Sequence, residues 1–379
     1  MKRILAAALG VLLLAALPLS AGAATLAEAG KSAVLMDVTT GTVLYEHNSH
    51  EALAPASVTK VMTMLLIMEA VDSGKISLAD TVTASEAAAA KGGSQIYLKA
   101  GETMRVSDML KSIAVSSAND CACAMAEHIS GSESAFVEAM NQRAKELGMQ
   151  DTHFVNCTGL DDDDSARLHR TSAYDIALMS RELLKNHPDI KKYTTIWMDT
   201  VRNGTFGLSN TNKLIRFYPG ATGLKTGYTS GAGYCLSASA QKEGMELIAV
   251  VMGARTSQTR NAACKELLDY GFANFAVVTP EPEALPQVAV RLGKQAQVPA
   301  RMAESAGMLI EKSQRSGITT EISLKESVAA PVTRGQTLGS LAVKSGEQIL
   351  RQIPLVAAED VEKLTTGDIF LAVLRKAAM

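Results

Sequence analysis

Segments typical of β-strands lie at both ends of the first two thirds of this 379-residue chain, with helical segments between them. Residues 33–46 contain two β-branched runs around a Thr-Thr-Gly turn, which predicts a hairpin. Residues 220–253 predict three further strands separated by glycine-containing turns. Between them, residues 103–150 and 171–185 carry apolar side chains at helical spacing. A sheet with segregated helices is the α+β class, so this order predicts an α+β domain.

The last third of the chain has a different sequence pattern. Residues 257–272 predict a helix that ends at Gly271, and residues 277–287 then contain three prolines. Short alternating stretches beyond them, such as residues 339–344, predict a small all-β domain. The predicted division is a first domain, a C-terminal β-rich domain and a short tail, at residues 24–276, 285–370 and 371–379.

The N-terminal residues have the pattern of a secretory signal peptide. Lys2 and Arg3 form a positive start, residues 4–17 are an apolar run of fourteen, and Ala-Gly-Ala at 21–23 suits signal peptidase. Such a run is too short to span a bilayer comfortably, although an uncleaved anchor is the alternative. We expect residues 1–23 to be removed and the chain to be exported to the periplasm or the outer face of the cytoplasmic membrane.

Charge and composition exclude several classes of protein. The formal net charge is −2, so no basic field attracts nucleic acid. Five cysteines are an odd number for a secreted chain and suggest no disulfide framework, so we interpret them as small core residues. His47 and His50 lie in a polar, turn-like stretch, and His169 is expected only to cap or pack against a helix. No metal-binding pattern is present, and we expect neither a metal nor a cofactor.

A Ser-x-x-Lys motif begins a long apolar helix. Pro55 suits a first helical turn, so Ser57 lies near a helix N-terminus, and Lys60 follows one turn deeper among apolar residues. Burial there lowers the pKa of a lysine, and a neutral lysine can take a proton from serine. The alternative is a capping serine with a lysine that reaches solvent. A second copy, Ser239 to Lys242, falls on a predicted strand and is interpreted as accidental.

Two further motifs follow in order along the chain. Ser117-Ala118-Asn119 lies between an apolar run and a new helix, where Ser117, Asn119 or Asp120 could simply cap that helix. Lys-Thr-Gly begins at Lys225 on a predicted strand, where Gly227 would let a ligand backbone approach and the lysine would supply a fixed cation. The alternative for Lys225 is an edge-strand lysine that discourages aggregation.

The three motifs occur together in penicillin-binding proteins and class A β-lactamases. With "LAPASVTKVMT", "SSAND", "GLKTGYTSGAGYCLSASA" and "PLVAAEDVEK", the sequence resembles the low-molecular-weight penicillin-binding proteins that are D-alanyl-D-alanine carboxypeptidases, the S11 serine peptidases. The resemblance covers essentially the whole mature chain. It implies a β-lactamase/transpeptidase-like sheet flanked by helices, with a second small all-β domain.

The resemblance also implies a role for each motif residue. Ser57 would be the nucleophile, Lys60 its base, and Ser117 a proton relay that Lys225 helps to organise. Arg260 matches an arginine near the substrate carboxylate, although it could equally be a solvated residue on a helix face. The remaining implied contacts are substrate binding by Asn119, Lys225, Thr226 and Gly227, and an oxyanion hole formed by the backbone N–H groups of Ser57 and Tyr228.

The implied reaction removes the terminal D-alanine from peptidoglycan stem peptides through an acyl-enzyme, with β-lactams as covalent inhibitors. A serine β-lactamase is one alternative, because Glu182-x-x-x-Asn186 could supply the base that activates water, although Glu182 beside Arg181 is better explained as a helical ion pair. A non-catalytic cell-wall scaffold is the other. The apolar stretch 369–374 gives about three helical turns at most, so we expect weak or no association with a membrane surface.

Overall fold

The computed structural model describes residue 26 and residues 30–162, 164–279, 284–304 and 307–377. The predicted signal peptide, residues 1–23, lies outside this part of the chain. Within it, no helix combines the length and the apolar character that crossing a membrane requires.

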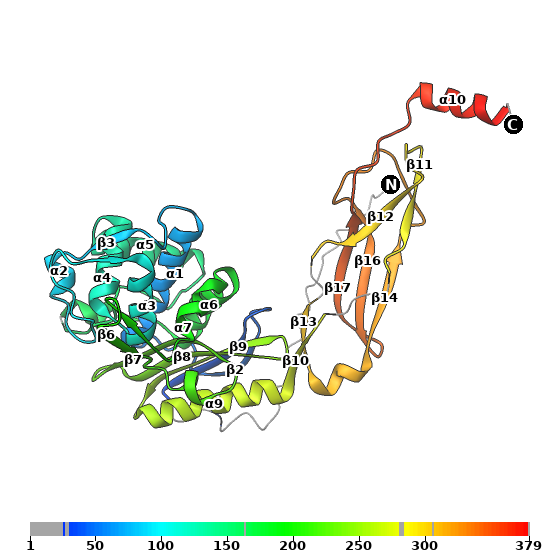
Figure 1. The fold of residues 1–379 in the computed structure, drawn as a ribbon. Helices are drawn as coiled ribbons and strands as arrows, with labels where there is room; N and C mark the ends of the chain where they lie inside the picture. Colours follow the sequence, from blue (N-terminus) through cyan, green and yellow to red (C-terminus); the bar gives the residue numbers. More distant parts are fainter. Residues whose placement is uncertain (1–25, 27–29, 163, 280–283, 305–306, 378–379) are drawn as a thin grey trace, which may run out of the picture.

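The two ends of the first domain meet in one antiparallel sheet of five strands, in the order β2-β1-β9-β8-β7 (Figure 1). The strands are β1 Ser32–Asp37, β2 Val43–His47, β7 Ala221–Thr229, β8 Gly233–Lys242 and β9 Met245–Ala254. The hairpin and the three later strands are therefore confirmed. Because β1 pairs with β9, residues more than 200 positions apart in sequence become neighbours.

Most helices cover one face of this sheet (Figure 1). They are α1 Lys60–Asp72, α2 Glu86–Ala89, α3 Val106–Ser116, α4 Asn119–Ser130, α5 Glu133–Glu146, α6 Ala173–Asn186 and α7 Lys191–Thr194. The short helix α8, Leu214–Phe217, lies on the other face, where Leu214 shares a core cluster with Leu236 and Leu267. Helix α1 is buried on nearly every side, which explains why its sequence is apolar all round. Two small hairpins complete the layer, formed by β3 Thr81–Thr83 with β4 Thr103–Arg105 and by β5 Met198–Val201 with β6 Phe206–Ser209.

Helix α9, Ser257–Asn274, covers the opposite face of the sheet and corrects one prediction. The helix does not end at Gly271 but continues for three more residues. A Cβ atom at Gly271 would lie 2.4 Å from Leu247 Cδ1 and 3.0 Å from Leu35 Cδ2. The glycine therefore lets the helix lie close to the sheet, and it has no role in ending the helix.

The second domain is all-β. Strand β10, Phe275–Val278, pairs with β13, Met308–Glu311, beside the end of α9. A six-stranded sheet in the order β14-β16-β17-β12-β11-β15 extends away from the first domain (Figure 1). Its strands are β11 Gln287–Arg291, β12 Gln297–Met302, β14 Ile318–Leu324, β15 Ser327–Ala329, β16 Thr337–Ser345 and β17 Gln348–Ala357. Both the α+β class and the small all-β domain are thus confirmed.

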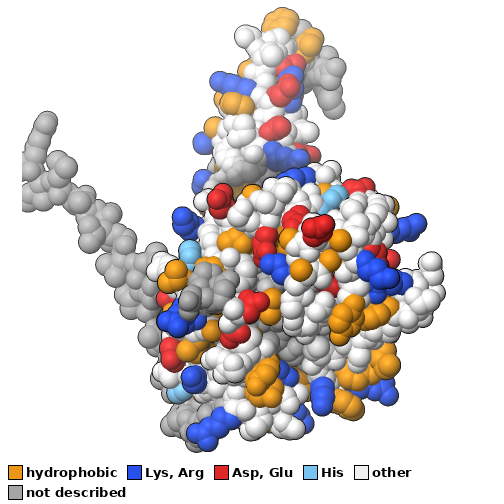
Figure 2. Space-filling model, turned by 90° about the vertical axis from the view of Figure 1, so that its left-hand side faces the viewer, with side chains coloured by type: hydrophobic (Ala, Val, Ile, Leu, Met, Phe, Trp, Pro, Cys, Tyr) orange, Lys and Arg blue, Asp and Glu red, His pale blue; other side chains and the backbone are white. Residues whose placement is uncertain are grey.

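Helix α10, Thr366–Ala377, follows this sheet at its far end (Figure 1). It begins five residues before the predicted tail, which was expected to start at residue 371. On the face seen in Figure 2, acidic and basic side chains are intermixed, and no continuous patch of one sign covers it. All five cysteines are buried and free, as the core interpretation predicted: Cys121, Cys123, Cys157, Cys235 and Cys264.

Candidate active site

Ser57 and Lys60 lie together where a short 3₁₀ turn, Ala56–Thr59, leads into α1. Lys60 Nζ is 2.9 Å from Ser57 Oγ and donates to the backbone carbonyl of Thr158 at 2.7 Å. The Lys60 side chain is fully buried, and neither Ser57 nor Thr59 makes a side-chain capping hydrogen bond to the helix. The alternative of a capping serine with a solvated lysine is therefore wrong.

The surroundings of Lys60 change its protonation. Burial lowers the pKa of Lys60 from its usual 10.5 to about 7, while Cys157 and the carboxylate of Asp120 act weakly in the other direction. A large fraction of this amine is therefore neutral near pH 7. A neutral amine has a lone pair that can accept the Ser57 proton, so the pair has the chemistry of a nucleophile and its base.

Ser117 occupies the sharp connection between α3 and α4. Its backbone is left-handed, with φ of +64°, and its side chain is buried. Within the described residues, Ser117 Oγ has no hydrogen-bond partner. The N-cap of α4 is Ala118, without a side-chain bond, so the alternative that Ser117, Asn119 or Asp120 simply caps this helix is wrong. A buried hydroxyl without a partner is costly and suggests a functional reason for its position.

Asn119 and Asp120 tie a neighbouring loop to the site. Asn119 Nδ2 donates to the carbonyl of Gly92 at 2.7 Å, whereas its Oδ1 is buried and finds no partner among the described residues. The Asp120 carboxylate accepts from the backbone N–H groups of Ile96 and Leu98. Asp120 was not predicted to anchor a loop, because nothing in the sequence shows which loop its carboxylate will meet.

Lys225 lies on the edge strand β7, yet its side chain is only 1% exposed, so the interpretation as a solvated edge lysine is wrong. Burial, followed by the charges of Lys60 and Arg260, holds the pKa of Lys225 well below its usual value. Its Nζ donates to the carbonyl of Thr226 at 2.9 Å. Among the described residues, no hydrogen bond joins Lys225 to Ser117, so the predicted contact between them is absent from this structure.

Gly227 has a structural role that the sequence did not indicate. A Cβ atom here would lie 2.7 Å from the carbonyl oxygen of Pro55 and 3.0 Å from the backbone nitrogen of Ser57. The glycine therefore serves first to let β7 approach the protein's own Ser57 segment, before any ligand is considered. The next residue, Tyr228, has a ring that is 56% exposed and lies 4.3 Å from that of Tyr234, between ring centroids.

Gly227→Ala is expected to reduce the rate of acylation by penicillin by about 10- to 100-fold, because displacing the backbone by a fraction of an ångström misplaces reacting groups. The Ser57 segment or β7 must shift, since the two nearest atoms to the added methyl group belong to the backbone and the third is the Cβ of Ala56 at 3.1 Å. Gly207→Ala on β6, where a Cβ meets nothing within 4 Å, is the matched control. Stopped-flow labelling of both variants checks this, and equal rates would contradict it.

Arg260 on α9 is 5% exposed, so it is not a solvated residue on a helix face. Its Nη1 donates to the carbonyl of Cys235 at 3.4 Å, and the guanidinium lies 5.9 Å from the centroid of the Tyr234 ring. Its charge contributes to the lowered pKa of Lys225. A buried cation in this position could assist Lys225 in attracting an anion.

Glu182 does not pair with its sequence neighbour Arg181, which instead donates to the carbonyl of Val38. The partner of Glu182 is Arg143 on α5, with 2.6 Å between Nη2 and Oε1, so the expected ion pair within one helix is wrong. The same guanidinium binds Glu69 of α1 at 2.7 Å. Three helices are thereby linked through one arginine.

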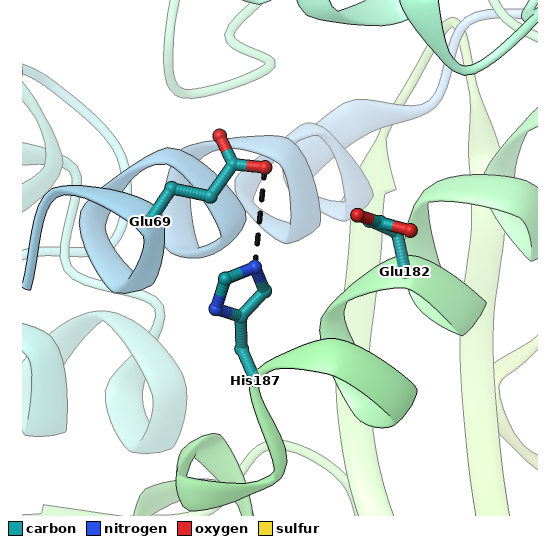
Figure 3. Close-up of side chains that lie close together, drawn as sticks. All are labelled: Glu69, Glu182 and His187. Atoms are coloured by element: carbon teal, nitrogen blue, oxygen red, sulfur yellow. Dashed lines mark ion pairs between the residues drawn. The ribbon is translucent and has the colours of Figure 1, made fainter. Parts of the chain in front are cut away.

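This cluster is remote from Ser57. Figure 3 shows Glu69 on α1 facing His187, which follows α6, with Glu182 beside them. Glu69 is nine residues beyond Lys60 along α1, about 14 Å at 1.5 Å per residue. Glu182 therefore cannot activate water at Ser57. These three residues are the group in the described chain that could hold a metal ion, but the Arg143 guanidinium already bridges both carboxylates.

The second Ser-x-x-Lys copy has no such surroundings. Ser239 Oγ is 2.8 Å from Thr222 Oγ1, and Lys242 Nζ lies 4.2 Å from the centroid of the Tyr218 ring. The two side chains thus have separate partners on the sheet, and the interpretation of this copy as accidental agrees with the structure.

Known proteins match this chain over nearly its whole length. Residues 20–256 match the family model of D-alanyl-D-alanine carboxypeptidase, and residues 280–363 match that of the C-terminal domain of penicillin-binding protein 5. The carboxypeptidase DacF of Bacillus subtilis is 48% identical over 344 residues, which are 89% of this chain and 87% of that protein. DacC of Escherichia coli is 34% identical over 87% of this chain and 84% of that protein.

Solved structures show the same architecture. Penicillin-binding protein 5 from Haemophilus influenzae superimposes with a TM-score of 0.76 at 31% identity, over 88% of this chain and 98% of its own. The ampicillin-bound penicillin-binding protein D2 from Listeria monocytogenes gives 0.59 at 31% identity, over 64% of this chain and 98% of its own. Because the family model matches more than half of the chain and DacF matches 89% of it, the chain belongs to the D-alanyl-D-alanine carboxypeptidases, the low-molecular-weight penicillin-binding proteins of the serine peptidase type.

Proposed function

We propose that Ser57 is the nucleophile of this carboxypeptidase and that Lys60 is its general base. The observation that carries the proposal is the 2.9 Å contact between Lys60 Nζ and Ser57 Oγ, made by an amine whose pKa burial lowers to about 7. Ser57 Oγ attacks the carbonyl carbon between the last two D-alanines of a stem peptide, and its proton passes to Lys60. The negative charge that develops on the carbonyl oxygen is stabilised by the backbone N–H groups of Ser57 and Tyr228.

The proton must then reach the leaving amine. Ser117, whose hydroxyl is buried and unpartnered in the described chain, is the proposed relay from Lys60 to the nitrogen of the departing D-alanine. Collapse of the tetrahedral intermediate breaks the peptide C–N bond and leaves an ester on Ser57. Water then attacks the ester carbonyl carbon while Lys60 takes its proton. The bond to Ser57 Oγ breaks, Lys60 returns the proton to that oxygen, and the shortened peptide leaves as a carboxylic acid.

An exopeptidase must recognise the C-terminal carboxylate of its substrate, because this group marks the last peptide bond. We assign its binding to Lys225 and Thr226, with Arg260 behind them and Asn119 against the peptide backbone. A substrate carboxylate would favour the charged form of Lys225, whose pKa the apolar surroundings hold low in the free protein. Only one of the three donors of that amine is used by the described residues.

β-Lactams acylate Ser57 in the same way, and the ester that remains is hydrolysed slowly. The structure of penicillin-binding protein D2 from Listeria monocytogenes in an ampicillin-bound form supports this assignment. A β-lactamase would need a base for rapid deacylation, and Glu182 of α6 is held at Arg143 beside Glu69, which lies about 14 Å along α1 from Lys60. A scaffold without activity would have no reason to keep a buried lysine against a serine.

The decisive test is mass spectrometry of the products from a synthetic pentapeptide that ends in two D-alanines. Loss of one alanine, together with fluorescent penicillin labelling that persists for many minutes, is the expected result. Rapid turnover of the drug would instead indicate a β-lactamase. Absence of both labelling and product would indicate a scaffold.

We further propose export to the periplasm or the outer membrane face, with weak or no attachment through α10. This helix spans twelve residues, about 18 Å, and its exposed apolar side chains include Phe370 and Leu371. Deleting residues 368–379 from the chain without residues 1–23 is expected to change the fraction bound to anionic vesicles by less than about twofold. Vesicle flotation measures this, and release of a largely bound protein by the deletion would show the proposal wrong.

A further inference from the structure

Ala56, which directly precedes Ser57, has an unusual backbone conformation. Ala56 has φ of +48°, in the left-handed region that side-chain-bearing residues rarely adopt. The bond is planar and trans, so the carbonyl of Ala56 and the N–H of Ser57 point in opposite directions from one rigid plane. Whatever fixes the Ala56 oxygen therefore also sets the direction of the Ser57 N–H.

A chain of hydrogen bonds ends on that oxygen. Thr59 Oγ1 donates to the carbonyl of Ala56 at 2.8 Å, and His169 Nε2 lies 2.8 Å from Thr59 Oγ1. The backbone N–H of Val155 donates to His169 Nδ1 at 3.1 Å. Nδ1 is therefore the acceptor and Nε2 carries the proton, so every bond in the chain has one donor and one acceptor.

The surroundings hold this chain in one direction. Thr59 is fully buried, His169 is 3% exposed, and burial lowers the pKa of His169 to about 4, so its ring is neutral at pH 7. Gly159 covers the same carbonyl from another side, since a Cβ there would lie 1.8 Å from the Ala56 oxygen. Of the two roles expected for His169, capping is excluded because the N-cap of α6 is Ser172, whereas packing agrees with its burial against the Phe154 ring.

We propose that Thr59 and His169 are positioning residues of the oxyanion hole, which act through the Ala56–Ser57 peptide plane. The inference rests on the proposed function, in which the Ser57 N–H stabilises the developing negative charge. On the opposite side of the plane, the Ser57 nitrogen faces Gly227 of β7, next to the second proposed donor at Tyr228. Hydrogen bonding to the Ala56 carbonyl also polarises the peptide, which makes the Ser57 N–H a stronger donor.

The first test compares two buried threonines of the same region. Thr59→Val removes the hydroxyl that binds the Ala56 carbonyl. Thr63→Val, one turn further along α1, removes a buried hydroxyl that binds the carbonyl of Cys157 at 2.6 Å and is the matched control. We expect Thr59→Val to slow acylation by penicillin about 10- to 100-fold, less than the loss of an entire oxyanion donor, with noncovalent affinity within about twofold. Thr63→Val should acylate within about twofold of the parent protein.

The second readout reports the oxyanion hole itself. A depsipeptide ester substrate and its thionoester differ in whether oxygen or the weaker acceptor sulfur receives the N–H groups. The acylation rate with the ester divided by the rate with the thionoester should fall in Thr59→Val and stay unchanged in Thr63→Val. A loss of stability alone, measured by thermal unfolding of both variants, leaves this ratio unaltered.

The histidine is tested by rescue. Glutamine can accept from Val155 and donate to Thr59, so His169→Gln should keep most of the activity, whereas His169→Leu should resemble Thr59→Val. Because the two residues act in series, Thr59→Val with His169→Leu should be about as slow as Thr59→Val alone. Parent-like acylation or an unchanged rate ratio in Thr59→Val would overturn the proposal. Failure of the parent protein to be acylated would instead overturn the proposed function.

Discussion

Replacing Ser57 by alanine is expected to abolish covalent labelling by penicillin and to slow D-alanine release by on the order of 10⁶-fold. Alanine offers no oxygen to attack the carbonyl, and Lys60 alone cannot form the ester. The fold should tolerate the change, because Lys60 keeps its hydrogen bond to the carbonyl of Thr158. Quantifying D-alanine released from the pentapeptide, alongside gel detection of fluorescent penicillin, measures both effects.

The chain carries its own control for this experiment. Ser239→Ala changes the serine of the second Ser-x-x-Lys copy, which is as buried as a core residue and bonds to Thr222. We expect acylation within about twofold of the parent rate and a stability loss of about 1 kcal/mol for the lost hydrogen bond. Persistent labelling of Ser57→Ala would mean that another residue is the nucleophile.

The architecture could be predicted because its signals are local. The hairpin of residues 33–46, the three strands after residue 220 and the helices between them each follow from a turn or a periodicity within a few residues. The pairing of β1 with β9 could not be read in the same way, because strand partners depend on the whole fold.

Two glycines show what local reasoning misses. Gly271 has the sequence context of a helix end, and Gly227 that of a strand open to a ligand. In the folded protein, Gly271 admits Leu247 and Gly227 admits the Ser57 segment. A sequence shows that a side chain is missing, but the backbone or side chain that needs the space comes from elsewhere in the chain.

In the site, too, some features could be predicted from the sequence and others depend on the fold. Burial of Lys60 could be predicted from its apolar neighbours, and the structure agrees. The acceptor for its amine, the carbonyl of Thr158, could not, because every residue has a carbonyl and only the fold selects one. For Glu182, the adjacent Arg181 was the obvious partner in sequence, yet the partner in space is Arg143.

Lys60→Met is expected to slow acylation by about 10²- to 10⁴-fold, the usual contribution of a positioned general base. Methionine keeps an apolar side chain of similar length but cannot accept the Ser57 proton. In the parent protein, only the neutral amine is active, and the pKa of Lys60 is about 7. The acylation rate of the parent should therefore fall tenfold per pH unit below pH 7 and level off above it. The variant should lack this acidic limb of the pH profile. Stopped-flow labelling between pH 5 and 9 distinguishes the two profiles.

Lys242→Met is the matched control, since Lys242 belongs to the accidental motif and lies over the Tyr218 ring. Its pH profile should keep the limb near pH 7. A Lys60→Met variant that retained this limb would identify a different base.

The same substitution should stabilise the fold in a pH-dependent way. The pKa of Lys60 is about 7 in the folded protein and near the ordinary 10.5 once the chain unfolds. Between these pH values the unfolded chain binds the additional proton, so rising pH favours the folded parent protein. Below pH 7 both states are protonated, and the folded protein bears the full cost of a buried charge. The melting temperature of Lys60→Met should therefore exceed that of the parent most clearly below pH 7, and the difference should shrink toward pH 10.5. A constant difference across this range would mean that the amine is solvated, and the proposed base would lose its physical reason.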